Sequence, residues 1–456
     1  MDLNKYIFRE YDIRGKVSDD FPPDVVESLG KGFGTFIKRG GGQEIALSGD
    51  VRLTTPDLIQ QFKTGVLSTG VDVINIGILP TPANYFSMFH LDVAGAVQIT
   101  GSHNPPEFNG FKMSQNKKAV FGESIQDIRT LIENQYYETG KGSEASYDIL
   151  SKYKRMISTK IDIQKRVKVV MDCGNAAGAI CGPDIFNNMN VDLTELFCDV
   201  DGTFPNHHPD PTVEANLTDL ISLMKTGKFD IGIAFDGDAD RVGVVDETGD
   251  IIWADQLMAI FLPEVLEEGD EILYDVKCSQ ALEEMIVKYG GKPIMWKTGH
   301  SLIKQRMGEL NCKLGGEMSG HIFFADDYYG YDDAIYVAAR IVQTLSRTDK
   351  TLSQLKAELP TYFSTPEMRL EAESDEEKFR IAKEAVAYFT DNYDCSTIDG
   401  VRIQFGDGWG LVRQSNTQPV IVCRFEANTP ERMAEIQSIV LDKLQTIGSL
   451  KLDAGH

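Results

Sequence analysis

Residues 44–52 read EIALSGDVR, an apolar run that ends in an acidic residue and a loop. The same pattern returns at VKVVMDCGN (167–175) and EILYDVKCS (271–279). Each copy precedes a stretch with helical character, such as TPDLIQQFKTGVLSTG (55–70) or QALEEMIVKYGG (280–291). Strands that alternate with helices are typical of parallel α/β sheets, which bind ligands at the carboxyl ends of their strands. Because the copies lie roughly a hundred residues apart, the sequence predicts three similar α/β domains with mixed or parallel sheets.

The C-terminal part of the chain has a different pattern. A charged helical stretch, ESDEEKFRIAKEAVAYFTDNY (373–393), precedes two strand-like segments, TIDGVRIQFGDGWGLVRQ (397–414) and VIVCRFEA (420–427). An amphipathic helix, TPERMAEIQSIVLDKLQTIG (429–448), follows them. This order predicts a smaller α+β domain. The expected domains are therefore 1–150, 151–250, 251–365 and 366–456.

Composition excludes several classes of protein. The formal net charge is −24 and the chain holds no run of Lys and Arg, so nucleic-acid binding is not expected. No apolar stretch is long enough to cross a bilayer, and no signal peptide is visible, so no membrane partner is expected. The seven cysteines form no CxxC pair, which fits a reducing cytoplasm. An anionic substrate would require a local cluster of basic residues to reverse the sign of the global field.

Ser102 lies in TGSHNPPEFNGFK (100–112), directly after the strand-like residues that end at Ile99. Ser, Asn, Gly and Pro cluster in ordinary turns for reasons of backbone geometry. Taken alone, the segment therefore leaves two interpretations open, a turn former or a nucleophile at the end of a strand.

Three carboxylates, Asp236, Asp238 and Asp240, lie in FDIGIAFDGDADRVGVV (229–245) between two apolar runs that resemble buried strands. In an extended loop, carboxylates on one face would lie roughly 7 Å apart. Ligand oxygens around Mg²⁺ lie at most about 4.2 Å apart, so the backbone must curl around an ion. Gly237 makes such a curl easy, and Ala239 is less permissive but small. Without a cation the three acids would repel one another, which favours a metal site over a solvated turn.

A calcium loop of the EF-hand type is the alternative, because D-x-D-x-D opens such loops and Glu247 falls at the twelfth position. The sixth position, which requires Gly for the sharp turn, is Arg241 here. The flanking segments also resemble strands rather than helices. An arginine directly after the third ligand suits a site that also binds an anion.

Several further loops carry basic or hydroxyl-binding groups. Residues 296–304, WKTGHSLIK, place Lys297 and His300 around a Gly turn, and Lys277 follows the third strand copy. GGEMSGH (315–321) places a carboxylate and a hydroxyl where they can bind vicinal sugar hydroxyls, and RQSNTQP (413–419) concentrates donors suited to a phosphate. Turn chemistry explains the glycines of each loop equally well. The candidate groups are Lys277, Lys297, His300, Glu317, Ser319, His321, Arg413, Ser415, Asn416 and Thr417.

Together these motifs resemble one family. FREYDIRG (8–15), TGSHNPPEFNGFK, DGDADR (236–241), GEMSGH (316–321) and RQSNTQP are similar to the signature motifs of the α-D-phosphohexomutases. Within that superfamily the match is to the bifunctional phosphomannomutase/phosphoglucomutases. VDGTFPNHHPDP (200–211) and MWKTGHSLIK (295–304) extend the resemblance through all four domains, which the family arranges around a central cleft. Two stretches depart from the family pattern: Ala239 stands where Gly is frequent, and GNAAG (174–178) shortens a Gly-rich loop.

The resemblance implies a role for each candidate residue. Ser102 carries a phosphoryl group that completes the coordination of Mg²⁺ by Asp236, Asp238 and Asp240, and His103 is then not its catalytic base. Glu317 and Ser319 hold sugar hydroxyls. The residues implied to grip the non-reacting phosphate are Tyr11, Arg413, Ser415, Asn416 and Thr417. Those implied to line the reacting side are Arg14, Lys112, Arg241, Lys277, His300 and His321, of which Lys112, Arg14 and His321 are the candidates for proton transfer.

The implied reaction is a reversible phosphate shift between C1 and C6 of mannose or glucose phosphate. It passes through a hexose 1,6-bisphosphate, which also serves as activator. The alternatives are a phosphoglucosamine mutase and a non-catalytic protein that binds sugar phosphates or metal on the same scaffold. The partners expected are small hexose phosphates, and the protein is expected to be a monomer or homodimer.

Overall fold

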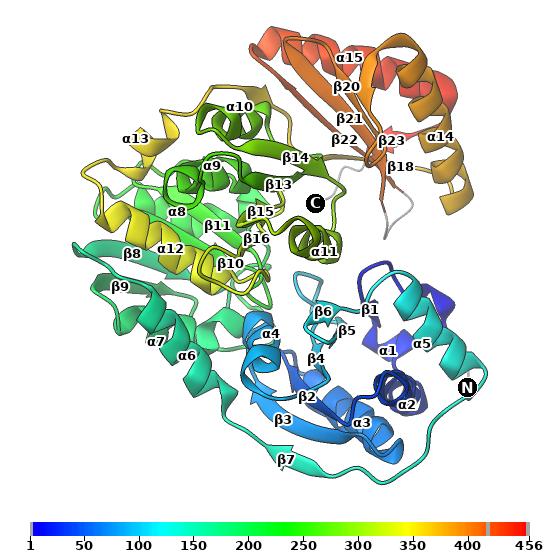
Figure 1. Ribbon diagram of the computed structural model, residues 1–456. Helices are drawn as coiled ribbons and strands as arrows, with labels where there is room; N and C mark the ends of the chain where they lie inside the picture. Colours follow the sequence, from blue (N-terminus) through cyan, green and yellow to red (C-terminus); the bar gives the residue numbers. More distant parts are fainter. Residues whose placement is uncertain (1–2, 416–419, 453–456) are drawn as a thin grey trace. The chain divides into compact units, whose positions relative to one another are not determined.

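The computed structural model describes residues 3–415 and 420–452 (Figure 1). The chain divides into two compact units. Unit 1 consists of Met1–Ala254 and Ser319–Leu355, and unit 2 consists of Asp255–Met318 and Lys356–His456. The stretch 251–365, expected to be one domain, therefore contributes residues to both units.

The first sheet of unit 1 has a mixed arrangement. Strands β2, β3, β4 and β7 pair in parallel, whereas β5 pairs antiparallel with both β4 and β1. Helix α2 packs against α3 and α5 (Figure 1). The elements are η1 (Lys5–Ile7), β1 (Ile13–Lys16), α1 (Val17–Asp20), α2 (Pro23–Arg39), β2 (Glu44–Gly49), α3 (Thr55–Ser68), β3 (Asp72–Ile78), α4 (Thr81–His90), β4 (Gly95–Ile99), β5 (Phe108–Gln115), β6 (Lys118–Ala119), α5 (Glu123–Glu133), β7 (Glu144–Ser146) and α6 (Ile149–Lys160).

The second sheet of unit 1 has the order β12-β11-β10-β8-β9, with β8, β9 and β10 parallel. Helix α12 comes from later in the chain and packs on β10 and β11, where its yellow ribbon lies beside green strands in Figure 1. The elements are β8 (Val167–Asp172), η2 (Ala177–Ile180), α7 (Gly182–Asn187), β9 (Val191–Leu196), η3 (Glu214–Leu217), α8 (Thr218–Met224), β10 (Ile231–Phe235), β11 (Val242–Asp246), β12 (Ile251–Ile252), β16 (Ile322–Phe324), α12 (Ala334–Ser346) and α13 (Leu352–Lys356).

Unit 2 begins with a parallel sheet in which β13 lies between β14 and β15. The side chain of Ser279 accepts a hydrogen bond from Ala281 N and so caps α10. The elements are α9 (Ala254–Val265), β13 (Glu271–Asp275), α10 (Gln280–Lys288), β14 (Lys292–Trp296), α11 (His300–Leu310) and β15 (Leu314–Gly316).

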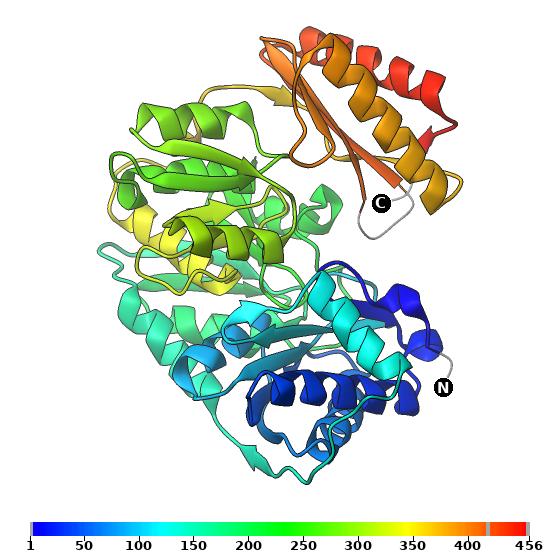
Figure 2. The same ribbon diagram turned by 45° about the vertical axis from the view of Figure 1, so that its right-hand side comes forward.

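The C-terminal part of unit 2 is an antiparallel sheet, covered by two adjacent helices that Figure 2 shows on the sheet in orange and red. Ser374 caps α14, and the acids 375–377 complement the positive end of the helix dipole. The elements are β17 (Phe363–Ser364), β18 (Met368–Glu371), α14 (Asp375–Asn392), β19 (Asp394–Ser396), β20 (Val401–Gln404), β21 (Gly408–Gln414), β22 (Val420–Ala427), α15 (Pro430–Ile447) and β23 (Lys451–Leu452). The predicted fold class, α/β followed by a smaller α+β part, is confirmed.

Within the described ranges, no helix combines the length and the apolar character needed to span a membrane.

A buried ion pair fixes the loop that follows β9. His207 Nε2 lies 3.0 Å from an oxygen of Asp172, whose side chain is fully buried at the end of β8. Burial lowers the pKa of His207, but the hydrogen bond to Asp172 and its charge outweigh burial, so the pKa lies above the usual value. A raised folded-state pKa means that the pair stabilises the fold fully below the unfolded pKa of about 6.5, and that this stabilisation is lost as pH rises through the folded pKa.

We therefore expect His207→Asn to lower the free energy of unfolding by about 1.5–3 kcal/mol at pH 6 and by less at pH 8.5. Urea unfolding at both pH values measures the difference from the wild type. The neighbouring His208→Asn preserves the ion pair and should keep the wild-type pH dependence. Equal pH dependence in the two variants would contradict the prediction.

Candidate active site

Ser102 lies in the loop after β4, as predicted, and its side chain is buried. Its φ of +50° is the left-handed conformation, which is uncommon for a residue with a Cβ. Ser102 Oγ donates to Asp236 Oδ2 at 3.1 Å and lies 3.0 Å from Nδ1 of His103. The structure therefore brings the serine into contact with the first of the three aspartates, although 134 residues separate them.

His103 is held neutral by its surroundings. Burial lowers the pKa of its imidazole well below the usual value, and the nearby charges of Arg241 and Arg14 lower it further. An imidazole that resists protonation is a poor acceptor for the serine proton. The contact with Ser102 therefore gives His103 little strength as a general base.

The aspartate loop joins β10 to β11, which pair antiparallel. Ala239 has a φ of +60° and so adopts the left-handed conformation, although Gly237 is the more permissive residue of the loop. Gly237 serves a different purpose, because a Cβ at that position would stand 2.1 Å from the carbonyl oxygen of Ser102. Glycine thus lets the aspartate loop approach the serine loop closely.

The three carboxylates are fully buried, and one oxygen from each lies within 4.8 Å of the others. Burial raises the pKa of Asp236 well above its usual value, and the charges of Asp238 and Asp240 raise it further. Asp236 Oδ1 accepts hydrogen bonds from the backbone N of Asp240 and of Arg241, both at 3.1 Å. These bonds curl the loop around its carboxylates.

Lys112 on β5 supplies positive charge to this group. Its Nζ donates to Asp238 Oδ2 at 2.6 Å and to Asp240 Oδ2 at 2.5 Å. Burial lowers the pKa of Lys112, but the charges of Asp238 and Asp240 outweigh it, so the net shift is upward. Thr81 at the start of α4 donates to Asp238 at 2.5 Å.

A metal ion fits this donor set. Asp238 Oδ1 is buried and has no hydrogen-bond partner among the described residues, so it is a ligand atom free to bind a cation. Oxygen-only ligands favour a hard divalent ion. Glu247, the twelfth residue of the alternative calcium loop, instead accepts hydrogen bonds from Ser353. The EF-hand interpretation is therefore wrong, because the loop joins two strands and its last ligand faces elsewhere.

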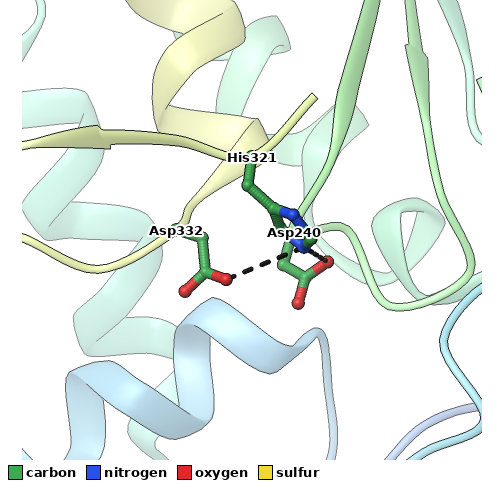
Figure 3. A group of neighbouring side chains, drawn as sticks. All are labelled: Asp240, His321 and Asp332. Carbon is green, nitrogen blue, oxygen red and sulfur yellow. Dashed lines mark ion pairs between the residues drawn. The ribbon is translucent and has the colours of Figure 1, made fainter. Parts of the chain in front are cut away.

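His321 lies between two carboxylates (Figure 3). Its Nε2 is 3.2 Å from Asp240 Oδ1 and 3.9 Å from Asp332 Oδ2. Arg241 Nε lies 3.3 Å from the same nitrogen, and Ser319 Oγ lies 3.2 Å from Nδ1. The imidazole therefore connects the aspartate loop with the hydroxyl that was predicted to bind sugar.

Arg14 projects from β1, whose register places it opposite Gly110 on β5. Its Nη2 lies 2.5 Å from Asp12 Oδ2. The side chain is only 19% exposed, and its charge contributes to the low pKa of His103. Tyr11 precedes this strand and is half-buried.

Unit 2 contains a second group of the predicted residues. Lys277 follows β13, and its Nζ lies 3.2 Å from Glu367 Oε2 and 3.9 Å from Asp275 Oδ2. The charge of Lys277 lowers the pKa of Glu367 to about 2. Burial lowers the pKa of Lys277, but Glu367 and Asp275 outweigh it and raise the pKa overall. Both groups are therefore charged at neutral pH.

Asp399 and Glu317 accept hydrogen bonds near the remaining predicted residues of unit 2. Arg413 Nε donates to Asp399 Oδ2 at 3.0 Å, and the same oxygen accepts from Thr298 N at 3.1 Å. Glu317 is buried after β15, where its Oε1 accepts from Gly299 N at 2.5 Å. His300 is the first residue of α11. Asp399 thus ties the loop before His300 to the arginine predicted to bind phosphate.

The predicted residues fall into two groups. Unit 1 holds Tyr11, Arg14, Ser102, Lys112, Asp236, Asp238, Asp240, Arg241, Ser319 and His321, and unit 2 holds Lys277, Lys297, His300, Glu317, Arg413 and Ser415. In unit 2, the backbone carbonyl of Ser415 accepts a hydrogen bond from Lys378. Asn416 and Thr417 lie outside the described residues.

Sequence reasoning missed the groups that hold these side chains. They are Asp12, Thr81, Asp332, Glu367 and Asp399, which contact Arg14, Asp238, His321, Lys277 and Arg413, respectively. Local signals existed for two of them: Asp12 stands in FREYDIRG (8–15), and Asp332 stands in the acidic pair of GYDDA (330–334).

Family comparisons cover nearly the whole chain. Residues 5–139, 151–249 and 253–363 match the models described as phosphoglucomutase/phosphomannomutase α/β/α domains I, II and III. Residues 367–443 match the C-terminal domain of the same family.

Individual relatives give the same result. The chain is 41% identical over 447 residues to a phosphomannomutase/phosphoglucomutase of Pseudomonas aeruginosa, covering 97% of this chain and 96% of the relative. It is 40% identical over 438 residues to a phosphoglucomutase of Neisseria meningitidis, covering 95% of each. A crystal structure of a phosphoglucomutase/phosphomannomutase family protein from Burkholderia thailandensis is 39% identical, with a TM-score of 0.93 over 98% of this chain and 100% of that one. The chain therefore belongs to the phosphoglucomutase/phosphomannomutase family of hexose-phosphate mutases.

Proposed function

We propose that this protein moves phosphate reversibly between C1 and C6 of mannose and glucose phosphates through a phosphoryl group on Ser102. The observation that carries the proposal is the contact between Ser102 Oγ and a buried group of three aspartates that is bridged by Lys112. Phosphoserine donates to the free hydroxyl of the bound sugar monophosphate, which becomes a hexose 1,6-bisphosphate. The other phosphate of that intermediate then returns to Ser102, and the same bisphosphate serves as activator.

Asp236, Asp238 and Asp240 would hold Mg²⁺, together with an oxygen of the Ser102 phosphate. A bound magnesium ion supplies positive charge that stabilises the serine oxygen as leaving group. Asp238 Oδ1 supports this assignment, because it is buried and has no hydrogen-bond partner among the described residues. Because phosphoryl transfer needs positioning and charge stabilisation more than covalent help, the weakness of His103 as a base is no obstacle.

Lys112, Arg14 and His321 are the proposed groups for proton transfer and charge stabilisation. Lys112 Nζ already contacts two of the carboxylates, and His321 Nε2 contacts Asp240. Arg241, directly after the third aspartate, is proposed to stabilise the charge of the transferred group.

A further set of candidate residues is proposed to bind the sugar phosphate. Arg413 offers the fork geometry suited to a phosphate, and Asp399 orients it through Nε. Lys277 and His300 add basic groups nearby in the same unit, and Tyr11 is proposed to help grip the phosphate. Glu317 and Ser319 are proposed to bind the 3- and 4-hydroxyls in both orientations of the sugar. Asn416 and Thr417 complete the proposed phosphate loop. Such a local basic cluster overcomes the global charge of −24.

Intact-mass measurement tests the phosphoserine directly. We expect a species about 80 Da heavier, mapped to Ser102 and discharged by glucose 1-phosphate or mannose 1-phosphate. Rates on these two sugars and on glucosamine 1-phosphate test the substrate class. A clear preference for glucosamine 1-phosphate would instead indicate a phosphoglucosamine mutase, and the absence of the heavier species under every condition would indicate a non-catalytic binding protein.

A further inference from the structure

A buried arginine lies behind the serine loop. Arg52 follows β2, and 1% of the residue is exposed. Its five N–H groups all have partners. Nε donates to Asp50 Oδ2 at 3.1 Å. The other four donate to backbone carbonyls of the serine loop, those of Ser102 (2.7 Å), Asn104 (2.6 Å), Pro105 (2.6 Å) and Phe108 (3.0 Å).

Asp50 adds further hydrogen bonds to the same loop. Its Oδ2 accepts from Thr100 Oγ1 at 2.7 Å and from Gly101 N at 3.2 Å, while Oδ1 accepts from Arg52 N at 3.0 Å. The two residues before Ser102 are therefore bonded to Asp50, and Ser102 itself is bonded to Arg52.

The hydrogen bonds of Arg52 and Asp50 hold the backbone around Ser102 in its observed conformation. A left-handed φ costs a non-glycine residue on the order of 1–3 kcal/mol, so the surroundings must impose it on Ser102. The carbonyl oxygen of Ser102 accepts from Arg52 Nη2 and also packs against Gly237 of the aspartate loop. Arg52 therefore holds the atom at which the serine loop and the aspartate loop meet.

Arg52 is covered by residues 200–211, VDGTFPNHHPDP. The catalytic assignments give this segment no role. The ring centroid of Phe204 lies 5.2 Å from the guanidinium carbon of Arg52. A Cβ at Gly202 would stand 2.2 Å from the carbonyl oxygen of Val51, so the segment lies directly on the backbone before Arg52. The ion pair of His207 with Asp172 anchors the same segment to β8.

We propose that Arg52 is a positioning residue that sets the distance between Ser102 and the three aspartates for phosphoryl transfer, and that Phe204 closes it off from solvent. The proposal rests on the proposed function of Ser102. Lysine cannot replace Arg52, because an ammonium has three donors and no planar fork, whereas four carbonyls and a carboxylate must be bonded here.

The test is Arg52→Lys, measured by kcat and KM per folded molecule and by the rate at which Ser102 phosphate is discharged to glucose 1-phosphate. A misplacement of about 1 Å can cost about a hundredfold in rate, so we expect kcat and the discharge rate to fall by about that factor. KM should change by less than about threefold, because the groups proposed to bind the sugar phosphate are untouched. Arg340→Lys is the matched control, since Arg340 is a buried arginine of the same unit that pairs with Asp326.

If the role of Arg52 is purely structural, Arg52→Lys and Arg340→Lys should both lose thermal stability but should have the same kcat per folded molecule. That result would overturn the proposal. If Arg52→Lys does not fold, Phe204→Leu replaces it, with an expected fall in kcat of several-fold at unchanged KM; an unchanged kcat would again overturn the proposal. The phosphorylation state of the wild type distinguishes a failure of the proposed function from a failure of the proposed role of Arg52. A wild type without Ser102 phosphate contradicts the proposed function, whereas a phosphorylated wild type with an unaffected Arg52→Lys contradicts only the role of Arg52.

Discussion

Ser102→Ala should lower mutase turnover by about a thousandfold or more while the fold survives. The reason is that the variant lacks the oxygen that is proposed to carry the phosphoryl group. The hydroxyl makes one hydrogen bond to Asp236 and one contact with His103, so its removal costs little stability. Coupled assays with glucose 1-phosphate and mannose 1-phosphate measure the loss, and intact mass should show no heavier species.

Ser346→Ala is the matched control for this prediction. Ser346 is also buried in unit 1, and its Oγ makes hydrogen bonds with Gln343 O at 2.7 Å and Gln164 N at 3.1 Å. Its loss should affect stability as much as the loss of Ser102 Oγ but leave turnover near that of the wild type. Near-normal turnover in Ser102→Ala would exclude Ser102 as the phosphate carrier.

Lys112→Met should lower the free energy of unfolding of the metal-free protein by about 3–5 kcal/mol and abolish most activity. Methionine keeps the length of the side chain but removes the charge that neutralises Asp238 and Asp240, so buried carboxylates would be left uncompensated. A divalent cation bound by the same carboxylates should replace that charge. Magnesium at about 100 times its dissociation constant should return about 2.7 kcal/mol.

Lys63→Met provides the comparison for the lysine variant. Lys63 is a largely buried lysine of α3 whose Nζ lies 2.8 Å from Glu144, a carboxylate with 36% of its side chain exposed. Its loss should cost only about 1 kcal/mol relative to the wild type, and this difference should be the same with and without magnesium, because the three aspartates and Lys112 are intact in this variant. Urea unfolding with and without magnesium chloride measures both variants. If magnesium left the deficit of Lys112→Met relative to the wild type unchanged, the cation would not replace the charge of Lys112 at the three aspartates.

Local patterns sufficed for much of the fold and of the candidate site. Apolar runs that end in acidic loops, each followed by a helical stretch, predicted the α/β units, because periodicity and turn residues act over a few positions. The aspartate loop was equally accessible, since its three carboxylates lie within five residues and must curl together. The residue at which the loop turns was not accessible in the same way. Ala239 adopts the left-handed φ, whereas Gly237 lies where Ser102 O approaches the loop closely, a contact that is invisible in the sequence.

The groups that orient the site depended on contacts between distant segments. Arg52 bonds carbonyls 50 to 56 residues away, and Lys277 meets Glu367 across 90 residues. Thr298 and Asp399 are 101 residues apart. None of these contacts has a signature in spacing or composition, because a buried charge can be paired by any segment that the fold places beside it. The candidate reacting groups could thus be proposed from short motifs, whereas their distances and their charge partners were decided by how the sheets and loops pack.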